Sequence, residues 1–396
     1  MMSHQVAIIG AGTSGVSAAV ALADRGIKPL LIDRADQVGS SWRSRYDRLR
    51  LNTGRQFSHL PNRPYPRGTP TFPTRDQVID HIERHANEDG IDLYLRCTAE
   101  RLDRVDGHWR LTTSTGTMEV PQVVVATGFD HEPFVPDWPG RDEWSRDLVH
   151  SSQYRNPLRY NGKQVLVVGP GCSGMEIAYD LATGGAAKVW LAARTPPNIM
   201  LRQGPGGIPG DFIATPLYRA PVRIADPIAR LARRMDIGDL REFGLPVPAE
   251  GIFARSSRLG VAPAILDKEV IAAIRDKSIE IVRGVESLDT DGVALADGAH
   301  INPDAMVCAT GFRRGLATLV GHLRVLDERG WPTATGEEPA ADGLRFIGFV
   351  ARPSQIGFAA KQARRAAKVI ARELRNASDR AQRPRPDPRQ AGRVDG

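Results

Sequence analysis

The sequence predicts an α/β protein with two Rossmann-like dinucleotide-binding domains, the second inserted in the first. Two glycine-rich turns support this prediction, each between an apolar strand and a helix, at residues 10–15 and 169–174. The string Ala-Thr-Gly-Phe also occurs twice, at 126–129 and 309–312, each time after an apolar strand. A chain of 396 residues usually forms more than one domain, so two nucleotide-binding units fit its length.

The first unit begins with the apolar run Gln5–Ile9, which predicts a buried strand. The turn Gly-Ala-Gly-Thr-Ser-Gly at 10–15 follows, and residues 16–25 predict a helix. The first glycine of such a turn allows tight bending, the second lets a pyrophosphate approach the backbone, and the third packs helix on strand. The phosphates then lie at the helix N-terminus, where free N–H groups point outward. Asp33, 23 residues after Gly10, ends the next predicted strand, where a carboxylate accepts hydrogen bonds from a ribose.

The second unit repeats this pattern, with a strand at Gln164–Val168, a glycine turn, a helix at 175–182 and a strand at Lys188–Ala192. Arg194 stands where the first unit has its acid, 25 residues after Gly169. Because a guanidinium pairs with a 2′-phosphate that a carboxylate would repel, this site is expected to prefer NADP to NAD. A solvated surface arginine is the alternative. The two sites together predict a bound FAD and a visiting NADPH.

The Ala-Thr-Gly-Phe strings are expected to close the two nucleotide folds. Their glycines supply a permissive backbone where the chain crosses between domains. The predicted organisation is a discontinuous FAD domain at 1–155 and 310–375, with an NADP domain at 156–309 between its two parts.

Residues 196–265 form a Pro- and Gly-rich insertion in the second domain. It either covers the flavin or makes a contact in a homodimer. Within it, residues 227–235 predict a short amphipathic helix with Arg230, Arg233 and Arg234 facing outward.

The net charge of +7 arises at the C-terminal end, where 12 basic and 4 acidic residues lie between Arg352 and Gly396. The remainder is near neutral, which disfavours a basic body that follows nucleic acid. A helix is expected from Phe358 to about Arg375, followed by a disordered basic tail at 376–396. The tail lacks aromatic residues for base stacking, so a nucleic-acid or membrane-surface binder is the weaker hypothesis.

Several function classes lack the residues that they need. No apolar run approaches the roughly 18 residues of a membrane span, and glycines interrupt the apolar N-terminus too early for a signal peptide. Cys97, Cys172 and Cys308 form neither a Cys-x-x-Cys pair nor a zinc pattern, so no metal is expected. A cytoplasmic enzyme without a hydrolase triad is predicted.

These residues resemble those of the class B flavoprotein monooxygenases, and most closely the YUCCA-like branch of the flavin-containing monooxygenase family. The resemblance runs from about Val6 to Arg375. Besides the glycine turns and the Ala-Thr-Gly-Phe strings, it includes Val38–Arg43, Tyr46–Leu51, Phe72–Thr74, Ser173–Glu176, Arg258–Gly260 and Gly343–Phe349.

The family fingerprint F-x-G-x-x-x-H-x-x-x-[FWY] falls at residues 144–154. His150 and Tyr154 match it, whereas Trp144 and Arg146 replace the Phe and the Gly. The Trp-Pro ending of Baeyer–Villiger members is absent, since Arg155 follows Tyr154. His150 is expected to hold the two domains in register by hydrogen bonding rather than to transfer protons.

The resemblance implies an oxidoreductase in which NADPH reduces FAD, and the reduced flavin takes up O2 as a C4a-(hydro)peroxyflavin. One oxygen atom would then pass to a small organic substrate. The YUCCA-like branch points to oxidative decarboxylation of a 2-oxo acid such as indole-3-pyruvate. N- or S-oxygenation, Baeyer–Villiger oxidation, and a flavin reductase that serves a partner protein are the alternatives. The expected partners are the substrate and O2, without nucleic acid or membrane.

Asn52 is the candidate catalytic residue, since flavin-containing monooxygenases resemble one another in placing an Asn near the flavin. A turn-forming Asn before Gly54 is the alternative. The helix that follows Gln355 is expected to face the pyrimidine end of the flavin with its N–H groups, or else simply to cap the fold. The candidate cofactor-binding residues are Gly10, Gly12, Thr13, Ser14, Gly15, Asp33, Arg34, Ser41, Trp42, Asn52, Ala126, Thr127, Gly128, Gly169, Gly171, Cys172, Ser173, Gly174, Arg194, Thr195, Ala309, Thr310, Gly311 and Gln355.

Overall fold

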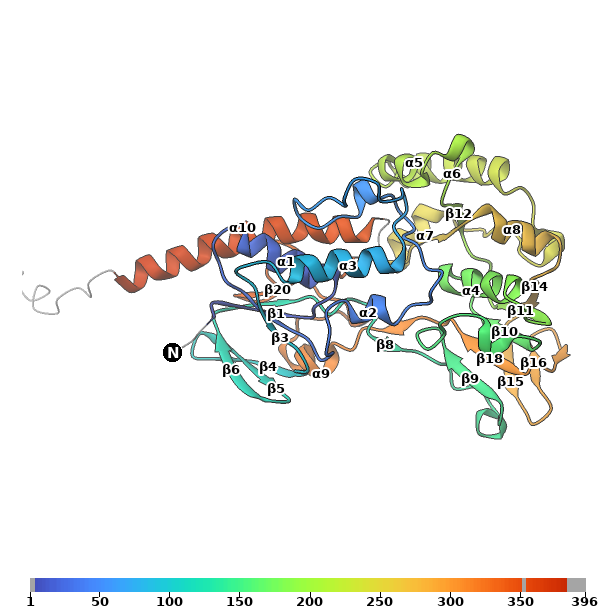
Figure 1. Cartoon of the computed structure of the whole chain (residues 1–396), viewed down its shortest axis with the longest axis horizontal. Helices are drawn as coiled ribbons and strands as arrows, with labels where there is room; N and C mark the ends of the chain where they lie inside the picture. Colours follow the sequence, from blue (N-terminus) through green and yellow to red (C-terminus); the bar gives the residue numbers. More distant parts are fainter. Residues whose placement is uncertain (1–3, 351–353, 383–396) are drawn as a thin grey trace, which may run out of the picture.

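The computed structural model describes residues 4–350 and 354–382 (Figure 1). Two parallel five-stranded β-sheets organise these residues. The strands of the first sheet are β1 (Val6–Ile9), β2 (Leu30–Ile32), β3 (Asp92–Tyr94), β7 (Gln122–Val125) and β20 (Leu344–Phe346). The strands of the second sheet are β9 (Asp147–His150), β10 (Gln164–Val168), β11 (Lys188–Ala193), β14 (Glu280–Arg283) and β18 (Ala305–Cys308).

The strand order confirms the predicted fold class. The first sheet runs β20-β7-β1-β2-β3 and the second β14-β11-β10-β18-β9, with β1 and β10 central in each. The neighbours pair in parallel, as crossover helices require. All strands of the second sheet lie between β7 and β20 in the sequence, so the second Rossmann-like domain is inserted in the first.

Helices and small sheets cover the two parallel sheets. The helices are α1 (Thr13–Ala23), α2 (Ser40–Arg43), α3 (Arg75–Ala86), α4 (Cys172–Thr183), α5 (Gly210–Leu217), α6 (Val222–Asp236), α7 (Ile252–Leu259), α8 (Lys268–Arg275), α9 (Ala317–Val320) and α10 (Gln355–Gln382). The remaining strands are β4 (Ala99–Val105), β5 (His108–Thr113), β6 (Gly116–Val120), β8 (Glu132–Pro133), β12 (Ile199–Leu201), β13 (Ala264–Leu266), β15 (Val285–Leu288), β16 (Val293–Leu295), β17 (His300–Ile301) and β19 (Phe312–Arg313).

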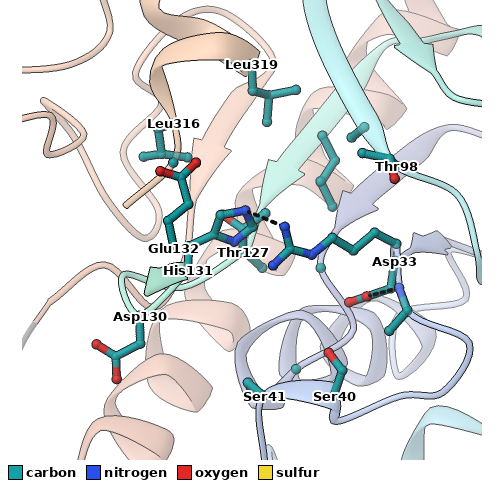
Figure 2. A pocket seen from close by; sticks show the side chains of 18 of the residues that line it. Asp33, Ser40, Ser41, Thr98, Thr127, Asp130, His131, Glu132, Leu316 and Leu319 are labelled. Carbon is teal, nitrogen blue, oxygen red and sulfur yellow. Dashed lines mark hydrogen bonds between the residues drawn. The ribbon is translucent and has the colours of Figure 1, made fainter. Parts of the chain in front are cut away.

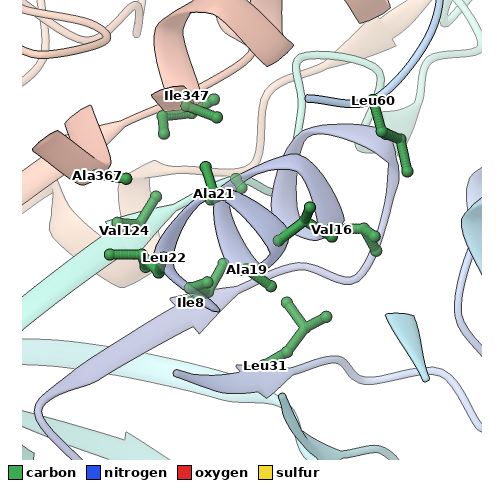
Figure 3. Packing of buried hydrophobic residues seen from close by; sticks show 14 of the residues in the cluster. Ile8, Val16, Ala19, Ala21, Leu22, Leu31, Leu60, Val124, Ile347 and Ala367 are labelled. Atoms are coloured by element: carbon green, nitrogen blue, oxygen red, sulfur yellow. The ribbon is translucent and has the colours of Figure 1, made fainter. Parts of the chain in front are cut away.

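Helix α1 lies between the first sheet and α10 (Figure 3). Because α1 begins within the first glycine turn, the packing of this helix also holds the turn in place. Val16 and Leu22 of α1 pack with Ile8 and Val124 of the sheet. From the other side α10 contributes a row of alanines, including Ala367, whose small side chains allow the two helices to approach closely. Each large apolar side chain buried in this way stabilises the domain by about 1.5 to 3 kcal/mol.

Strand β11 shows how the second sheet is buried on both faces. Val189 and Leu191 point to the face that α4 and α8 cover, and Trp190 and Ala192 point to the face that β15 and β16 cover. A parallel strand covered on both sides needs a continuous apolar run, and this explains the sequence Val-Trp-Leu-Ala-Ala.

Strand β9 corrects the predicted domain boundary. Residues 147–150 fall inside the segment 1–155 that the sequence assigns to the first domain, yet they pair with β18 at the edge of the second sheet. Leu148 and Val149 alternate between the two cores of that sheet, and this alternation fits an edge strand.

The insertion at 196–265 is more regular than its composition suggests. It contains the helices α5, α6 and α7, and α6 extends over Val222–Asp236 rather than 227–235. The expected outward direction of Arg233 is wrong, because Arg233 lies with Ala225 and Ala229 on the buried face, while Arg230 and Arg234 are exposed.

The C-terminal helix is longer than predicted at both ends. It begins at Gln355 and ends at Gln382, beyond the expected end near Arg375, so residues 376–382 are helical rather than part of a disordered tail. The remainder of the predicted tail, 383–396, lies outside the described residues, as does Arg352. None of the described helices is long and apolar enough to cross a membrane.

Candidate active site

A cavity of about 720 Å³ opens beside the first glycine turn (Figure 2). Gly10 and Gly12 line it from the turn, Asp33 from the end of β2, and Thr127 from the loop after β7. Its lining extends to Phe312, where β8 and β19 pair at the crossing between the domains. Of the predicted cofactor-binding residues, the cavity brings together Gly10, Gly12, Asp33, Arg34, Ser41, Ala126 and Thr127.

Backbone contacts make glycine necessary in this turn. Gly10 has a φ of +105°, and a Cβ on Gly15 would lie 1.7 Å from the carbonyl oxygen of Gly10. Gly12 precedes α1 as its N-cap, and no side chain among the described residues caps that helix. The first N–H groups of α1 are therefore free to donate to phosphate oxygens, which fits the pyrophosphate of FAD.

Asp33 is held rigidly beside the turn. Its carboxylate accepts a hydrogen bond from the N–H of Ala11 at 2.6 Å and another from the N–H of Ala35 at 2.9 Å. A carboxylate has about four acceptor positions, so two remain for a ribose diol. The neighbouring Arg34 reaches His131, with 3.3 Å between Nη1 of the arginine and Nε2 of the histidine. Burial, with the charge of Arg34, lowers the pKa of His131.

His150 links the two domains in its neutral form. Its Nε2 lies 2.9 Å from the carbonyl oxygen of Gly311, which can only accept, and its Nδ1 lies 3.1 Å from the N–H of Ser152, which can only donate. The proton is therefore on Nε2. Burial lowers the pKa of His150, which favours the same neutral form. The arrangement fits the expected structural role.

The second glycine turn repeats the geometry of the first. Gly169 has a φ of +109°, and a Cβ on Gly174 would lie 1.8 Å from the Gly169 carbonyl oxygen. Gly171 is the N-cap of α4, again without a side-chain cap among the described residues. Cys172 turns its Sγ toward β13, where it accepts from the N–H of Ile265 at 3.2 Å. The backbone of the turn, rather than this thiol, is therefore free for the phosphates of NADPH.

Arg194 lies exposed directly after β11, beside Thr195. No hydrogen bond or ion pair with any other described residue holds its guanidinium. The stem of Arg194 packs against Gly284, where an added Cβ would come within 3.1 Å of the Cβ of Arg194. A positioned stem and a free charged end are suited to bind the 2′-phosphate of NADPH.

Asn52 does not line the large cavity among the described residues and lies instead beside a buried cluster around Arg202. The Nη2 of Arg202 donates to Asn52 Oδ1 at 3.1 Å and to Glu176 Oε1 at 2.6 Å, while Nη1 donates to Asp267 Oδ2 at 2.5 Å. The side chains of Arg202 and Glu176 are only 3% and 4% exposed. Burial raises the pKa of Glu176, against the opposing charge of Arg202.

The insertion holds the loop that carries Asn52. Asp211 of α5 accepts a hydrogen bond from the N–H of Gly54 at 2.7 Å, and Phe212 packs edge-on against Phe57 at 5.1 Å between ring centres. A small cavity of about 10 Å³ remains between Asn52, Arg202 and Asp211. The sequence leaves two roles open for the insertion, a cover over the flavin or a contact in a homodimer. The hydrogen bond between Asp211 and Gly54 supports the role of a cover.

The residues predicted from the sequence do not include Arg202 and Glu176, which form the buried cluster beside Asn52. The available signals were a charge directly after the apolar strand β12 and an acid on the buried face of α4. Gln355 was predicted, but it does not line the large cavity among the described residues. Its Nε2 donates to the carbonyl oxygen of Gly348 at 2.9 Å, and Gly348 abuts Ser14 of α1, so Gln355 anchors the start of α10 near the first turn.

The glycines of the two Ala-Thr-Gly strings have the expected backbone. Gly128 and Gly311 have φ values of +77° and +88°, which glycine adopts without strain. Thr310 Oγ1 hydrogen-bonds the carbonyl oxygen of Phe134, so the second string is tied to the crossing between the domains. Trp42 packs against the core of the first domain.

A family model described as pyridine nucleotide-disulphide oxidoreductase matches residues 7–199. This match covers both glycine turns and the two strands that precede them. Among the described residues, however, Cys97, Cys172 and Cys308 form no disulfide with one another, and no two of them have the Cys-x-x-Cys spacing.

Two plant proteins are similar over most of their length. The indole-3-pyruvate monooxygenase YUCCA1 of Oryza sativa subsp. japonica is 35% identical over 311 residues, 77% of this chain and 76% of its own. The probable indole-3-pyruvate monooxygenase YUCCA8 of Arabidopsis thaliana is 32% identical over 357 residues, 86% of this chain and 83% of its own.

A solved structure shares the fold. The flavin-containing monooxygenase from Stenotrophomonas maltophilia superposes with a TM-score of 0.71 at 20% identity, covering 94% of this chain and 100% of that protein. Cyclohexanone monooxygenase superposes with a TM-score of 0.73 at 16% identity, covering 94% and 88%.

Proposed function

The chain belongs to the class B flavoprotein monooxygenases, in the YUCCA-like branch of the flavin-containing monooxygenase family, and we propose that it catalyses oxidative decarboxylation of a 2-oxo acid such as indole-3-pyruvate. It is an oxidoreductase whose cofactors are FAD and NADPH. The observation that carries the proposed substrate class is the 35% identity to a protein named for indole-3-pyruvate over three quarters of both chains.

The two glycine turns are proposed to bind the two dinucleotides. The free N–H groups of α1 and Gly12 would bind the pyrophosphate of FAD, and Asp33 would bind its ribose. The second turn and α4 would bind NADPH, with Arg194 on the 2′-phosphate. When bound, FAD supplies the redox chemistry, because it accepts hydride from NADPH and activates O2. The chain itself supplies binding, orientation and exclusion of water.

Asn52 is proposed to act at the reacting centre through its amide. Since Arg202 donates to Asn52 Oδ1, the amide nitrogen must point away from Arg202 and remains available as a donor. Arg202 would therefore be a positioning residue that sets the orientation of Asn52. The insertion would shield this region from water, because Asp211 ties it to Gly54.

The domain division proposed here follows from the sheets. The FAD domain would comprise 1–146 and 310–375, and the NADP domain 147–309, because β9 pairs in the second sheet. The insertion at 196–265 would belong to the second domain and reach over the first.

Product analysis under ¹⁸O2 tests the proposed reaction. The FAD-loaded protein is mixed with NADPH and indole-3-pyruvate, and indole-3-acetate with one ¹⁸O atom, CO2 and one NADP per turnover are expected. If a tertiary amine or thioether is oxygenated, while in the presence of 2-oxo acids the reduced enzyme only converts O2 to hydrogen peroxide, N- or S-oxygenation replaces the proposal. If NADPH reduces the flavin but no oxygenated product forms with either class, the chain acts as a reductase.

Replacing Arg194 with alanine is expected to weaken NADP binding about tenfold or more, since hydrogen bonds to charged groups contribute roughly 1.5 to 3 kcal/mol. NAD lacks the 2′-phosphate, so its dissociation constant should stay nearly unchanged. Titration of the oxidised holoprotein with each nucleotide measures both constants. Arg194→Lys is the control that keeps the positive charge without the planar guanidinium. Its dissociation constant for NADP should lie between those of the parent protein and of Arg194→Ala. Equal losses for NADP and NAD would refute the assignment.

A further inference from the structure

One region holds most of the exposed apolar surface. The described part of the chain has 12 exposed large hydrophobic side chains, and ten of them lie in the insertion at 196–265. Helices α5 and α6 of this region lie together at one end of the molecule, on the outside of the second domain (Figure 1). A broad surface could therefore reach them without obstruction from the two sheets.

Helix α6 presents a regular apolar stripe to solvent. Its members are Ile224, Ile228, Leu231 and Met235, which are 50%, 44%, 58% and 71% exposed. Their spacing of four, three and four residues places them on one side of an α-helix. This stripe is defined by these four residues and is called the α6 stripe below.

The opposite side of α6 is firmly attached to the protein. Ala225 and Ala229 are buried against Ile252 and Phe253 of α7. Asp226 accepts hydrogen bonds from the N–H of Phe253 at 2.8 Å and of Ala254 at 3.2 Å. The helix thus packs by its small residues and turns its large apolar residues outward, the reverse of an ordinary surface helix.

Arginines flank the α6 stripe on one side. At 100° per residue, Arg223, Arg230 and Arg234 fall between the stripe and the buried face, and all three are exposed. The one exposed acid of α6 is Asp236, at its last residue. A surface that covers the stripe must therefore accommodate positive charge beside apolar contacts.

We propose that α6 binds an anionic lipid surface, with the α6 stripe at the acyl boundary and the three arginines on lipid phosphates. Basic amphipathic helices lie in the membrane interface in this way. A second copy of the chain is a poorer partner, because an antiparallel two-fold contact through the stripe would bring the same arginine flanks together. Attachment would be peripheral, which differs from the sequence-based expectation of no membrane partner. The proposal does not depend on the substrate.

Co-sedimentation with vesicles tests the proposal on the full-length, FAD-loaded protein. Binding to vesicles of phosphatidylcholine with phosphatidylglycerol is expected, with much weaker binding to phosphatidylcholine alone and a decrease as salt is added. The double variant Ile228→Ser with Leu231→Ser should lose binding by about tenfold or more, since it removes two apolar side chains from the acyl boundary. Arg230→Glu with Arg234→Glu should lose the preference for anionic lipid.

Matched variants separate α6 from other surfaces. Leu158→Ser removes a 78% exposed leucine outside the insertion and should leave binding unchanged. Deletion of residues 383–396, which carry Arg383, Arg385, Arg389 and Arg393, should also leave it unchanged. Flavin content and NADPH oxidation of each variant report folding. Unaltered binding of the Ile228/Leu231 variant would overturn the proposal. The proposal would also be overturned if the parent protein does not bind vesicles and instead forms a dimer in light scattering that the Ile228/Leu231 variant abolishes.

Discussion

The Gly15→Ala variant is expected to purify without its yellow flavin. The added Cβ would lie 1.7 Å from the carbonyl oxygen of Gly10, a contact that only a shift of the backbone can relieve. Such a shift moves the N-terminus of α1, whose N–H groups are proposed to bind the pyrophosphate. Overpacking of this kind costs about 1 to 3 kcal/mol, which corresponds to roughly a five- to 150-fold loss of affinity for FAD if the whole cost falls on the bound state. The visible absorbance of the purified protein measures the flavin content.

Gly174→Ala is the matched control in the second domain. Its Cβ would meet the Gly169 carbonyl oxygen at 1.8 Å, so the local distortion is comparable. This variant should keep its flavin, which dithionite still reduces, while NADPH no longer reduces it. Loss of flavin in both variants, or retention of normal affinity for FAD in Gly15→Ala, would contradict the assignment of the two turns.

Arg202→Met should destabilise the fold by about 3 to 5 kcal/mol, because it leaves the carboxylates of Glu176 and Asp267 without their counter-charge. Denaturant titration of the free energy of unfolding measures this loss. Arg202→Lys, which keeps the charge but not the three hydrogen bonds, should lose less. If Arg202→Met unfolds at the same denaturant concentration as the parent, the cluster does not hold the domains together.

The free energy of unfolding should depend on pH differently in the parent protein and in Arg202→Met. Burial raises the pKa of Glu176 in the folded state above its ordinary value of 4.5, so the folded state keeps a proton that the unfolded state releases. Stability from this group is present below about pH 4.5 and is lost as pH rises through the folded pKa. Without Arg202 the carboxylate is still harder to ionise, so in Arg202→Met the loss should continue to higher pH.

Local features of this chain could be predicted from the sequence, and contacts between distant segments could not. The strand, turn and helix at residues 6–23 follow from steric rules that involve neighbouring residues alone. The contact between Arg202 and Asn52 joins residues 150 positions apart, and no local pattern contains it. A resemblance to a family points to Asn52, whereas only the fold shows that Arg202 is its partner.

Helix α6 shows a second limit of sequence patterns. An amphipathic pattern indicates a helix but does not say which side meets the protein. The expected orientation turned Arg233 outward, whereas packing against α7 selected the side with Ala225 and Ala229. Strand β9 is a similar case. Its four residues are too few for the alternation of buried and exposed side chains to show which sheet they join.

The position of β20 and α10 sets an order of events during synthesis. Strand β20 pairs with β7, and α10 covers α1. In the sequence, the second domain lies between β7 and β20. The ribosome adds roughly 5 to 20 residues per second, so the N-terminal sheet waits tens of seconds or less for its last strand and helix. The second domain is contiguous and can fold during this interval. The turn proposed to bind FAD therefore reaches its final packing only after residues 344–382 have been made, and the second domain can fold before then.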